Sequence, residues 1–322
     1  MLIIDEQTAL KAVGMADAID AVEQAFIALE QGQAELFPVV TGHGGAPDRF
    51  FAVKSGVVGD RNLAGLKLGT YWPANRVAGL PSHGSTVLLM DTATGFPAAL
   101  VSATGLTAIR TAAADAVAVR HLARPDAAVL GIVGAGHQAW YDLLAIRHVR
   151  PIKRVLVWNR DPVRADAFAQ RARGLGLDAA ATSLEETARG ADILVTATAA
   201  REALVRAQWV RPGTHISAMG ADAPGKQELD TALVASSLLV ADSIAQSLSI
   251  GECQSAARAG LIGPGDVTTL GAVILGKGRP VPPDTVTMFD SSGTAIQDLA
   301  VAGLAVSRSL DQGLGTRVPL GA

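Results

Sequence analysis

The stretch Val129-Leu130-Gly131-Ile132-Val133-Gly134-Ala135-Gly136-His137-Gln138-Ala139 decides the fold class of this 322-residue chain. Its apolar first half predicts a buried strand, and the G-x-G-x-x-A sequence that follows predicts a strand-to-helix turn. Gly134 permits the tight turn, Gly136 lets the backbone approach a pyrophosphate, and the small Ala139 lets the helix pack closely on the sheet. The N-terminus of that helix offers N–H groups to an anion. The stretch therefore predicts a dinucleotide-binding turn; a purely structural glycine turn is the alternative.

Strand and helix signals alternate on the C-terminal side of this turn. The predicted strands are 128–133, 154–158, 192–197, 214–219 and 238–242, and the predicted helices are 136–149 and 162–175. Such alternation is typical of a doubly wound parallel sheet. The sequence thus predicts an α/β fold in which residues 116–299 form a Rossmann-type dinucleotide-binding domain.

The N-terminal side of the chain has a different pattern. Short apolar segments separated by Gly, Pro and Asn predict a mostly antiparallel sheet, with strands at 49–53, 65–70, 85–90 and 98–102. Helices are predicted at 15–31, 106–122 and 295–314. We expect residues 1–115 together with 300–322 to form a second, α+β domain.

Composition excludes several classes of function. A net charge of −3 and an aromatic content of 4% argue against a nucleic-acid partner. The single cysteine, Cys253, excludes an intramolecular disulfide and a multi-cysteine metal site. No metal-ligand spacing and no Ser-His-Asp arrangement is legible, so no metal is expected. Residues 1–6 lack a signal-peptide layout and no apolar run spans a bilayer, which favours a cytoplasmic protein without a membrane partner.

The tip of the second predicted Rossmann strand bears on the choice of cofactor. An acid near this tip binds the ribose 2′-hydroxyl of NAD, whereas an arginine accommodates the 2′-phosphate of NADP. Asn159 and Arg160 occupy the tip, Arg164 lies one turn further, and Asp161 comes slightly late. NADP is therefore favoured over NAD, and the alternative is that both arginines are simply solvated.

Several separated motifs resemble those of the ornithine cyclodeaminase and mu-crystallin family over nearly the whole chain. They are Gly65-Leu66-Lys67-Leu68, Pro73-Ala74-Asn75, Gly79-Leu80-Pro81, residues 106–113 (LTAIRTAA), the Gly134 turn, residues 220–229 (GADAPGKQEL) and Phe289-Asp290-Ser291-Ser292-Gly293. The resemblance implies hydride transfer between nicotinamide and the α-carbon of a small amino or imino acid. It also implies a homodimer joined through the N-terminal, substrate-binding domain.

The resemblance assigns roles to three charged residues. Lys67 would hold a substrate carboxylate or exchange a proton, and Arg110 would bind the carboxylate through its guanidinium fork. Asp222, which follows a predicted strand, would take part in proton transfer. The alternatives are an exposed lysine, a helix-surface salt bridge and a turn aspartate; Lys54 is a weaker candidate than Lys67.

One departure from the family pattern concerns the substrate carboxylate. Family members usually carry an arginine shortly after the first proline of the pocket strand, but this chain reads Phe37-Pro38-Val39-Val40-Thr41. Either another cation substitutes for it, such as Arg49, Arg76 or His83, or the substrate is held differently. A structural histidine is the alternative for His83.

Further cofactor contacts are expected on both sides of the Gly134 turn. Thr196 and Thr198 are candidates for the nicotinamide ribose or amide, and Ser292 and Gly293 for the border of the nicotinamide. The remaining candidates are Thr111, His137, Gln138 and Met219.

The predicted function is reduction of a small α-imino acid by NAD(P)H. Residues 71–75 and 249–254 are most similar to the iminosuccinate reductases of the family, which form aspartate. A cyclic ketimine reductase is the alternative within the same class. An ornithine-cyclodeaminase-type lyase with recycled NAD, and a non-catalytic crystallin-like protein that binds NADP or a small ligand, are the alternatives from other classes.

Overall fold

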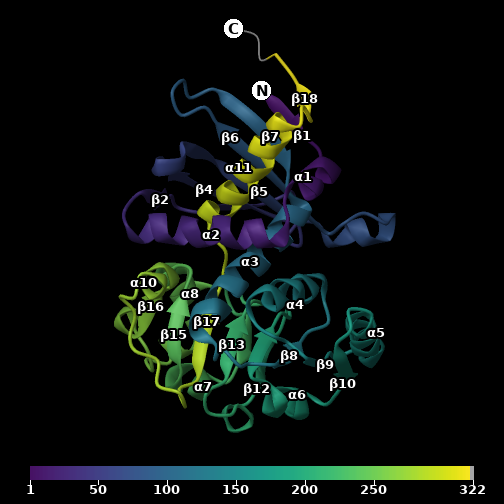
Figure 1. Ribbon diagram of the computed structural model, residues 1–322, viewed down its shortest axis with the longest axis vertical. Helices are drawn as coiled ribbons and strands as arrows, with labels where there is room; N and C mark the ends of the chain where they lie inside the picture. Colours follow the sequence, from purple (N-terminus) through teal and green to yellow (C-terminus); the bar gives the residue numbers. More distant parts are fainter. Residues whose placement is uncertain (320–322) are drawn as a thin grey trace. The chain divides into compact units, whose positions relative to one another are not determined.

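The computed structural model describes residues 1–319, and for Asp60 and Arg76 the backbone alone. The chain forms two compact units (Figure 1). Unit 1 consists of Met1–Arg110 and the described residues from Thr294 onward, and unit 2 is Thr111–Gly293. The boundaries expected from the sequence lie a few residues further along at both places. The second boundary differs because the start of the last helix packs within unit 1.

Unit 2 is built around an eight-stranded sheet in which every pairing is parallel. Its order is β10 (Asp178–Ala181), β9 (Arg154–Trp158), β8 (Val129–Val133), β11 (Ile193–Thr196), β13 (His215–Ala218), β17 (Thr287–Asp290), β15 (Leu238–Ala241) and β16 (Val267–Thr269). The jump from β10, β9 and β8 to β11 and β13 marks the switch point of a doubly wound sheet. The predicted Rossmann-type architecture is confirmed.

Helices connect the parallel strands of unit 2 (Figure 1). They include α4 (His137–Val149), α5 (Pro162–Arg173), α6 (Leu184–Gly190), α7 (Thr231–Ser236), α8 (Ile244–Ser249), α9 (Gln254–Arg258) and α10 (Leu270–Ile274). A small parallel pair, β12 (Arg201–Val205) and β14 (Gln227–Leu229), lies outside the main sheet. The central strands β11, β13 and β17 are fully buried, as expected for a parallel sheet covered on both faces.

Unit 1 contains a second, mostly antiparallel sheet. Its order is β18 (Thr316–Arg317), β1 (Leu2–Ile4), β7 (Pro97–Ser102), β6 (His83–Met90), β5 (Leu63–Tyr71), β4 (Phe50–Val58) and β2 (Ala34–Leu36), with β3 (Val40–His43) also paired to β4. Its helices are α1 (Glu6–Ala12), α2 (Met15–Glu30), the start of α3 (Thr104–Leu122) and α11 (Ala295–Asp311). The predicted α+β character of this part is observed.

Helix α11 packs on one face of the unit 1 sheet, where it contacts β4, β5 and β6 as well as α2 (Figure 1). Glycines on the strands permit this close approach. A Cβ at Gly65 would lie 3.2 Å from a methyl group of Leu299, and one at Gly56 would lie 3.5 Å from the Cβ of Ala295. The first turn of α11 is thereby held against β4 and β5.

Several strands escaped prediction. β10 reads Asp-Ala-Ala-Ala, a composition with weak strand preference, and it forms because β9 offers an open edge in parallel register. β1 and β2 have only three residues each, too few for a periodic signal. Among the described residues, no helix is long and apolar enough to cross a membrane.

Candidate functional site

A buried charge cluster in unit 1 joins three elements. Lys67 comes from β5, Arg110 from α3 and Asp298 from the first turn of α11. Lys67 Nζ lies 3.0 Å from Oδ1 and 2.8 Å from Oδ2 of Asp298, and Arg110 Nε lies 2.9 Å from Oδ1. Arg110 Nη1 also donates to Gln297 Oε1 at 2.8 Å. The structure thus brings together two of the predicted substrate-binding residues.

Burial decides the chemistry of this cluster. The exposed fractions of Lys67, Arg110 and Asp298 are 5%, 6% and 4%. Burial lowers the pKa of Lys67 to about 7, and the positive charges of Arg110 and Lys54 act in the same direction, while Asp298 opposes them. Burial works to raise the pKa of Asp298, but Arg110 and Lys67 outweigh it and the net shift is downward. Lys67 is therefore poised to gain or lose a proton near neutral pH beside a firmly ionised carboxylate.

The structure excludes the alternatives that the sequence left open for Arg110 and Lys67. Arg110 is a buried member of an ion-pair cluster, not part of a helix-surface salt bridge, and Lys67 is not an exposed lysine beside a strand. Asp298 and Gln297 were missed. The signal for them is a polar pair inside the otherwise apolar run Ala295-Ile296-Gln297-Asp298-Leu299-Ala300, where both residues are buried.

The other cations proposed for the substrate lie away from this cluster. His83 is exposed at the start of β6, where its ring lies tilted against that of Tyr71 with 4.7 Å between centroids. Val87, four residues further along β6, is the residue opposite Lys67. Arg49 is exposed just before β4. The side chain of Arg76 lies outside the described residues.

The dinucleotide turn in unit 2 has the predicted geometry. Gly134 has a φ of +105°, and a Cβ there would lie 2.6 Å from the carbonyl oxygen of Ala197, so this position requires glycine. A Cβ at Gly136 would meet nothing within 4 Å, which leaves open space where the turn faces outward. Gly136 is also the N-cap of α4 and makes no side-chain cap, so the first N–H groups of the helix are not taken by a cap. These features fit a pyrophosphate.

Side chains behind the turn hold it in place. Asn159 Oδ1 accepts a hydrogen bond from the N–H of Ala135 at 3.1 Å. Gln138 Nε2 donates to Oδ1 of Asp142 at 2.8 Å. Asp142 is fully buried, and it was not predicted. His137 and Ala139 lie in the same first turn of α4, with Ala139 fully buried against the sheet.

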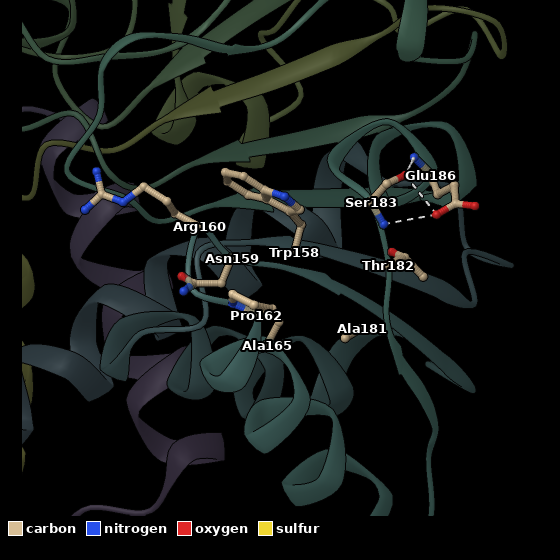
Figure 2. Close-up of a pocket in the computed structure, with 9 residues that line it drawn as sticks. All are labelled: Trp158, Asn159, Arg160, Pro162, Ala165, Ala181, Thr182, Ser183 and Glu186. Carbon is tan, nitrogen blue, oxygen red and sulfur yellow. Dashed lines mark hydrogen bonds between the residues drawn. The ribbon is translucent and has the colours of Figure 1, made fainter.

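A cavity of about 560 Å³ is lined in part by Asn159, the residue that holds this turn (Figure 2). Its lining includes the end of β9 with the residues that follow it, and the start of α6, and comprises Trp158, Asn159, Arg160, Pro162, Ala165, Ala181, Thr182, Ser183 and Glu186. Glu186 closes a capping box by accepting from both the N–H and the hydroxyl of Ser183 (Figure 2). The cavity is suited to the adenosine end of a dinucleotide, with Arg160 at its rim.

Two other residues at this tip are engaged elsewhere. Asp161 caps α5 by accepting from the N–H of Val163 at 3.0 Å. Arg164 lies 3.7 Å from Asp161, and it is not among the described residues that line the cavity. One carboxylate oxygen of Asp161 therefore caps α5, and the other faces Arg164.

A buried glutamate organises the strand ends near the predicted nicotinamide contacts. Glu228 accepts from Thr196 Oγ1 at 2.8 Å, from the N–H of Thr198 at 2.6 Å and from the N–H of Gly220 at 3.0 Å. Thr196 is fully buried and gives its hydroxyl proton to Glu228, which leaves Thr198, half-buried, better placed for a cofactor. Glu228 lies within the motif at residues 220–229, but no role was predicted for it from the sequence.

The remaining predicted residues are spread over unit 2. Asp222 is exposed and forms an ion pair with Lys226, so its position is that of a turn aspartate with a nearby cation. Ser291 Oγ and the N–H groups of Ser292 and Gly293 donate to Asp242. Met219 is buried directly after β13, and Thr111 is half-buried on α3. Among the described residues no group of three or more His, Cys, Asp or Glu is arranged to hold a metal.

Comparisons with known proteins agree with this geometry. The model of the ornithine cyclodeaminase/mu-crystallin family matches residues 4–313. The iminosuccinate reductase of Paracoccus denitrificans is 40% identical over 320 residues, which cover 99% of this chain and 100% of that protein. Its crystal structure in complex with NAD⁺ superposes with a TM-score of 0.95 over 99% of both chains.

Two further solved structures are similar over the full length. An archaeal alanine dehydrogenase dimer with bound NAD has a TM-score of 0.96 at 35% identity, and covers 100% of this chain and 99% of that chain. The Δ¹-pyrroline-2-carboxylate reductase of Thermococcus litoralis, in complex with NADH and L-proline, has a TM-score of 0.93 at 35% identity, and covers 99% of this chain and 100% of that chain.

Proposed function

This chain belongs to the ornithine cyclodeaminase/mu-crystallin family, and from that premise we propose that it reduces a small α-imino acid to an amino acid with a nicotinamide dinucleotide. The observation that carries the proposal is the buried cluster of Lys67, Arg110 and Asp298. Such a cluster binds a carboxylate and holds an exchangeable proton in one place. The best specific substrate is iminosuccinate, which would yield aspartate; its support is the similarity to the Paracoccus enzyme.

The roles of the residues follow from their chemistry. The bound nicotinamide supplies the hydride that reaches the carbon of the C=N bond. Arg110, oriented by Asp298 and Gln297, binds the α-carboxylate. Lys67 donates the proton that the nitrogen takes up, since its lowered pKa makes it an effective acid near pH 7. Reduction should therefore slow as the pH rises through about 7 and Lys67 loses its proton.

Cofactor choice belongs to the same proposal. We expect both NAD and NADP to bind, with NADP bound more tightly, because Asp161 and Glu186 are tied to helix caps while Arg160 borders the cavity. Titration with NADH and NADPH tests this, together with Arg160→Ala. The variant should lose affinity for NADPH by about tenfold, as expected for one charge-assisted contact, and change little toward NADH. Equal losses for both cofactors would contradict the NADP preference.

We also propose a homodimer formed through unit 1. On the face of its sheet opposite α11, Val40 pairs with Val53 and Val53 with Leu68, so that these side chains form one apolar row. Val40 is 60% exposed and Leu68 is 38% exposed. An apolar sheet face of this kind favours association with a second copy, and a similar archaeal alanine dehydrogenase is a dimer. Light scattering should give twice the mass of one chain, and the Leu68→Glu variant should give the mass of a single chain.

The experiment that tests the activity follows oxidation of NADH and NADPH over a panel of substrates. The panel contains oxaloacetate plus ammonia, pyruvate plus ammonia, Δ¹-pyrroline-2-carboxylate and L-ornithine. Wild type, Lys67→Ala and the surface control Lys11→Ala are compared, and Lys67→Ala should be about 10²–10⁴-fold slower, the range for a lost general acid. Lys11 is exposed on α1, so its variant should match the wild type.

Other outcomes would replace the proposal. Consumption of L-ornithine without net change in the cofactor would identify a lyase. Cofactor binding without turnover on any substrate would identify a binding protein. A wild-type rate in Lys67→Ala would remove the role given to that lysine.

A further inference from the structure

One buried glutamine in unit 2 is bonded to the loop that carries Asp222. Gln254 is the first residue of α9, and its side chain is fully buried. The loop connects β13 to β14 and lies within the motif at residues 220–229. Gln254 also ends the segment 249–254, which is similar to the iminosuccinate reductases. The structure therefore joins two stretches that the sequence shows only as separate motifs.

The loop contains a tight turn at Ala223-Pro224-Gly225-Lys226. The N–H of Lys226 donates to the carbonyl oxygen of Ala223 at 3.3 Å, and Gly225 has a φ of +77°. Proline at the second position and a glycine with positive φ at the third are typical of a type II turn. The central N–H of such a turn, here that of Gly225, has no partner within the turn and needs one elsewhere.

Gln254 supplies that partner and also bonds both ends of the turn. Its Oε1 accepts from the N–H of Gly225 at 2.8 Å. Its Nε2 donates to the carbonyl oxygens of Ala223 and Lys226, at 3.2 Å and 3.1 Å. One side-chain amide is thus bonded to three of the four residues of the turn.

The surroundings of Gln254 allow one orientation of its amide. Nε2 also lies 3.0 Å and 2.9 Å from the carbonyl oxygens of Ile250 and Gly251, which precede α9. Oε1 accepts a second hydrogen bond, from Arg258. Turning the amide over would place its oxygen against carbonyl oxygens and its nitrogen against N–H donors. Gln254 therefore fixes the position of the turn relative to α9.

The loop is also held at its other end. Glu252, two residues before Gln254, is buried and accepts from the N–H of Glu228 at 2.9 Å. Glu228 in turn accepts from the N–H of Gly220 at 3.0 Å. Asp222 lies in the chain between these two anchored points, while its own side chain is exposed. The position of its carboxylate thus depends on how firmly the loop is held.

We infer that Gln254 is a positioning residue, which holds the turn at residues 223–226 so that Asp222 is correctly placed for proton transfer. Ligands of a parallel sheet bind beyond the carboxyl ends of its strands, and Asp222 follows the carboxyl end of β13. The exposed ion pair of Asp222 with Lys226 fixes this geometry less firmly, because exposed pairs are weak. This inference rests on the proposed imino-acid reduction and on the role that the family resemblance implies for Asp222.

A double-mutant cycle separates this role from a merely structural one. The kcat for iminosuccinate, formed from oxaloacetate and ammonia, is measured for Gln254→Met, for Asp222→Asn and for the variant with both changes. Methionine has a similar length but no donor. Gln254→Met alone should lower kcat by about 10- to 100-fold, since misplacing a catalytic group by about 1 Å can cost about 10²-fold. In the Asp222→Asn background the same change should cost about twofold or less, because the group that Gln254 positions is already lost.

The KM for the imino acid should change little in Gln254→Met, because the change leaves Arg110 and Lys67 intact. Gln246→Met is the matched control. Gln246 is half-buried on the neighbouring α8, and its side-chain oxygen has no hydrogen-bond partner among the described residues, so kcat should equal that of the wild type. Equal losses from Gln254→Met in both backgrounds, or an unchanged kcat in Gln254→Met or Asp222→Asn, would overturn the inference.

Amide hydrogen exchange tests the position of the turn without any turnover. In Gln254→Met the N–H of Gly225 loses its acceptor, and its exchange should be faster by about 2- to 10-fold, which corresponds to one hydrogen bond. Arg258→Ala changes an exposed residue that orients the amide, and it should act in the same direction even where Gln254→Met does not fold. Absence of oxidation with every substrate would overturn the proposed function, and exchange then decides alone whether Gln254 holds the turn. Unchanged exchange at Gly225 in these variants would overturn the inference.

Discussion

Asp298 in unit 1 and Asp115 in unit 2 are both buried aspartates, yet their carboxyl groups behave in opposite ways. Asp298 has two cations in contact, and its pKa lies below the ordinary value. Asp115, on α3, has a pKa raised to about 7 because burial dominates and the nearby Ser217 hydroxyl offsets only part of it. The same side chain is thus a fixed anion in one unit and a group that holds its proton in the other.

Other carboxyl groups of unit 2 also have a raised pKa, like Asp115, but they accept more hydrogen bonds. Asp290 accepts from the Ser247 hydroxyl and from the N–H groups of Glu252 and Cys253, yet burial raises its pKa to about 6. Burial also raises the pKa of Glu228 despite three donors. Backbone donors therefore reduce the effect of burial without reversing it, whereas the cations of unit 1 do reverse it for Asp298.

The difference separates two uses of a buried acid. In unit 1 the acid is the counter-charge of the buried cations Lys67 and Arg110. In unit 2 the acids tie strand ends and helix starts together, as Glu228 does for Thr196 and Gly220. Substitutions of these acids and of the exposed Asp222 test this difference, and they follow in order of their expected effect on the free energy of unfolding.

Asp298→Ala should have the largest effect. It leaves Lys67 and Arg110 buried without their counter-charge, and removing one partner of a buried ion pair costs about 3–5 kcal/mol. Urea unfolding at pH 7 measures the loss. Asp17→Ala, which breaks an exposed pair with Arg308, is the control and should cost about 1 kcal/mol or less. A loss below that control value would mean that Asp298 is not the charge that balances unit 1.

Asp115→Asn should change the pH dependence of stability. The folded pKa of about 7 exceeds the unfolded value of 3.8, so the folded state keeps a proton that the unfolded state loses. The contribution of Asp115 to the free energy of unfolding is therefore greatest below about pH 4. It falls as the pH rises to about 7 and then stays low.

The asparagine variant lacks this loss. Relative to wild type it should gain about 2–3 kcal/mol between pH 5 and pH 8, at about 1.4 kcal/mol per unit up to the folded pKa. Unfolding curves at several pH values measure the difference. Asp142 shares the site, and the negative charge of Asp115 helps to raise its pKa, so Asp142→Asn should show the same trend. A difference that does not depend on pH would show that Asp115 is ionised in the folded protein.

Glu228→Gln should have an intermediate effect. The amide offers one acceptor oxygen in place of two, so at least one of the donors from Thr196, Thr198 and Gly220 loses its partner, at about 1–3 kcal/mol. Thermal unfolding gives the loss, and NADH titration should show weaker binding because Thr198 and Gly220 shift. Glu185→Gln, in an exposed pair with Arg189, is the matched control. Unchanged NADH affinity would separate Glu228 from the cofactor site.

Asp222→Asn should have the smallest effect on stability. Its pair with Lys226 is exposed, so the free energy of unfolding should change by less than about 0.5 kcal/mol. If Asp222 takes part in proton transfer, kcat should nevertheless fall by about 10²-fold or more. Steady-state kinetics of Asp222→Asn and of the control Lys226→Gln measure this. An unchanged kcat would leave Asp222 as a turn residue.

Long segments with a clear sequence pattern were predicted well, and strands of three or four residues were predicted poorly. The Gly134 turn and the alternating strands of unit 2 carry strong local patterns, and their geometry follows from them. β10, β1 and β2 have no such pattern. Each of them is a strand only because it forms hydrogen bonds with another strand: β10 with β9, β1 with β7 and β2 with β4. Lys67 and Arg110 were identified through motifs, while Asp298, Glu228 and Asp142 were not, since a lone acid in a helix or loop does not indicate its burial.

The α/β class and the pyrophosphate turn follow from the sequence, because glycine spacing and apolar periodicity act through local backbone geometry. Lys67 and Arg110 were identified by the resemblance of their motifs to those of the family. Which charges meet follows from the packing of the chain. Lys67 and Asp298 are 231 residues apart in sequence, and Lys54 opposes Lys67 only through the register of β4 and β5. A pKa and a counter-charge depend on distances between such residues, and those distances arise from packing.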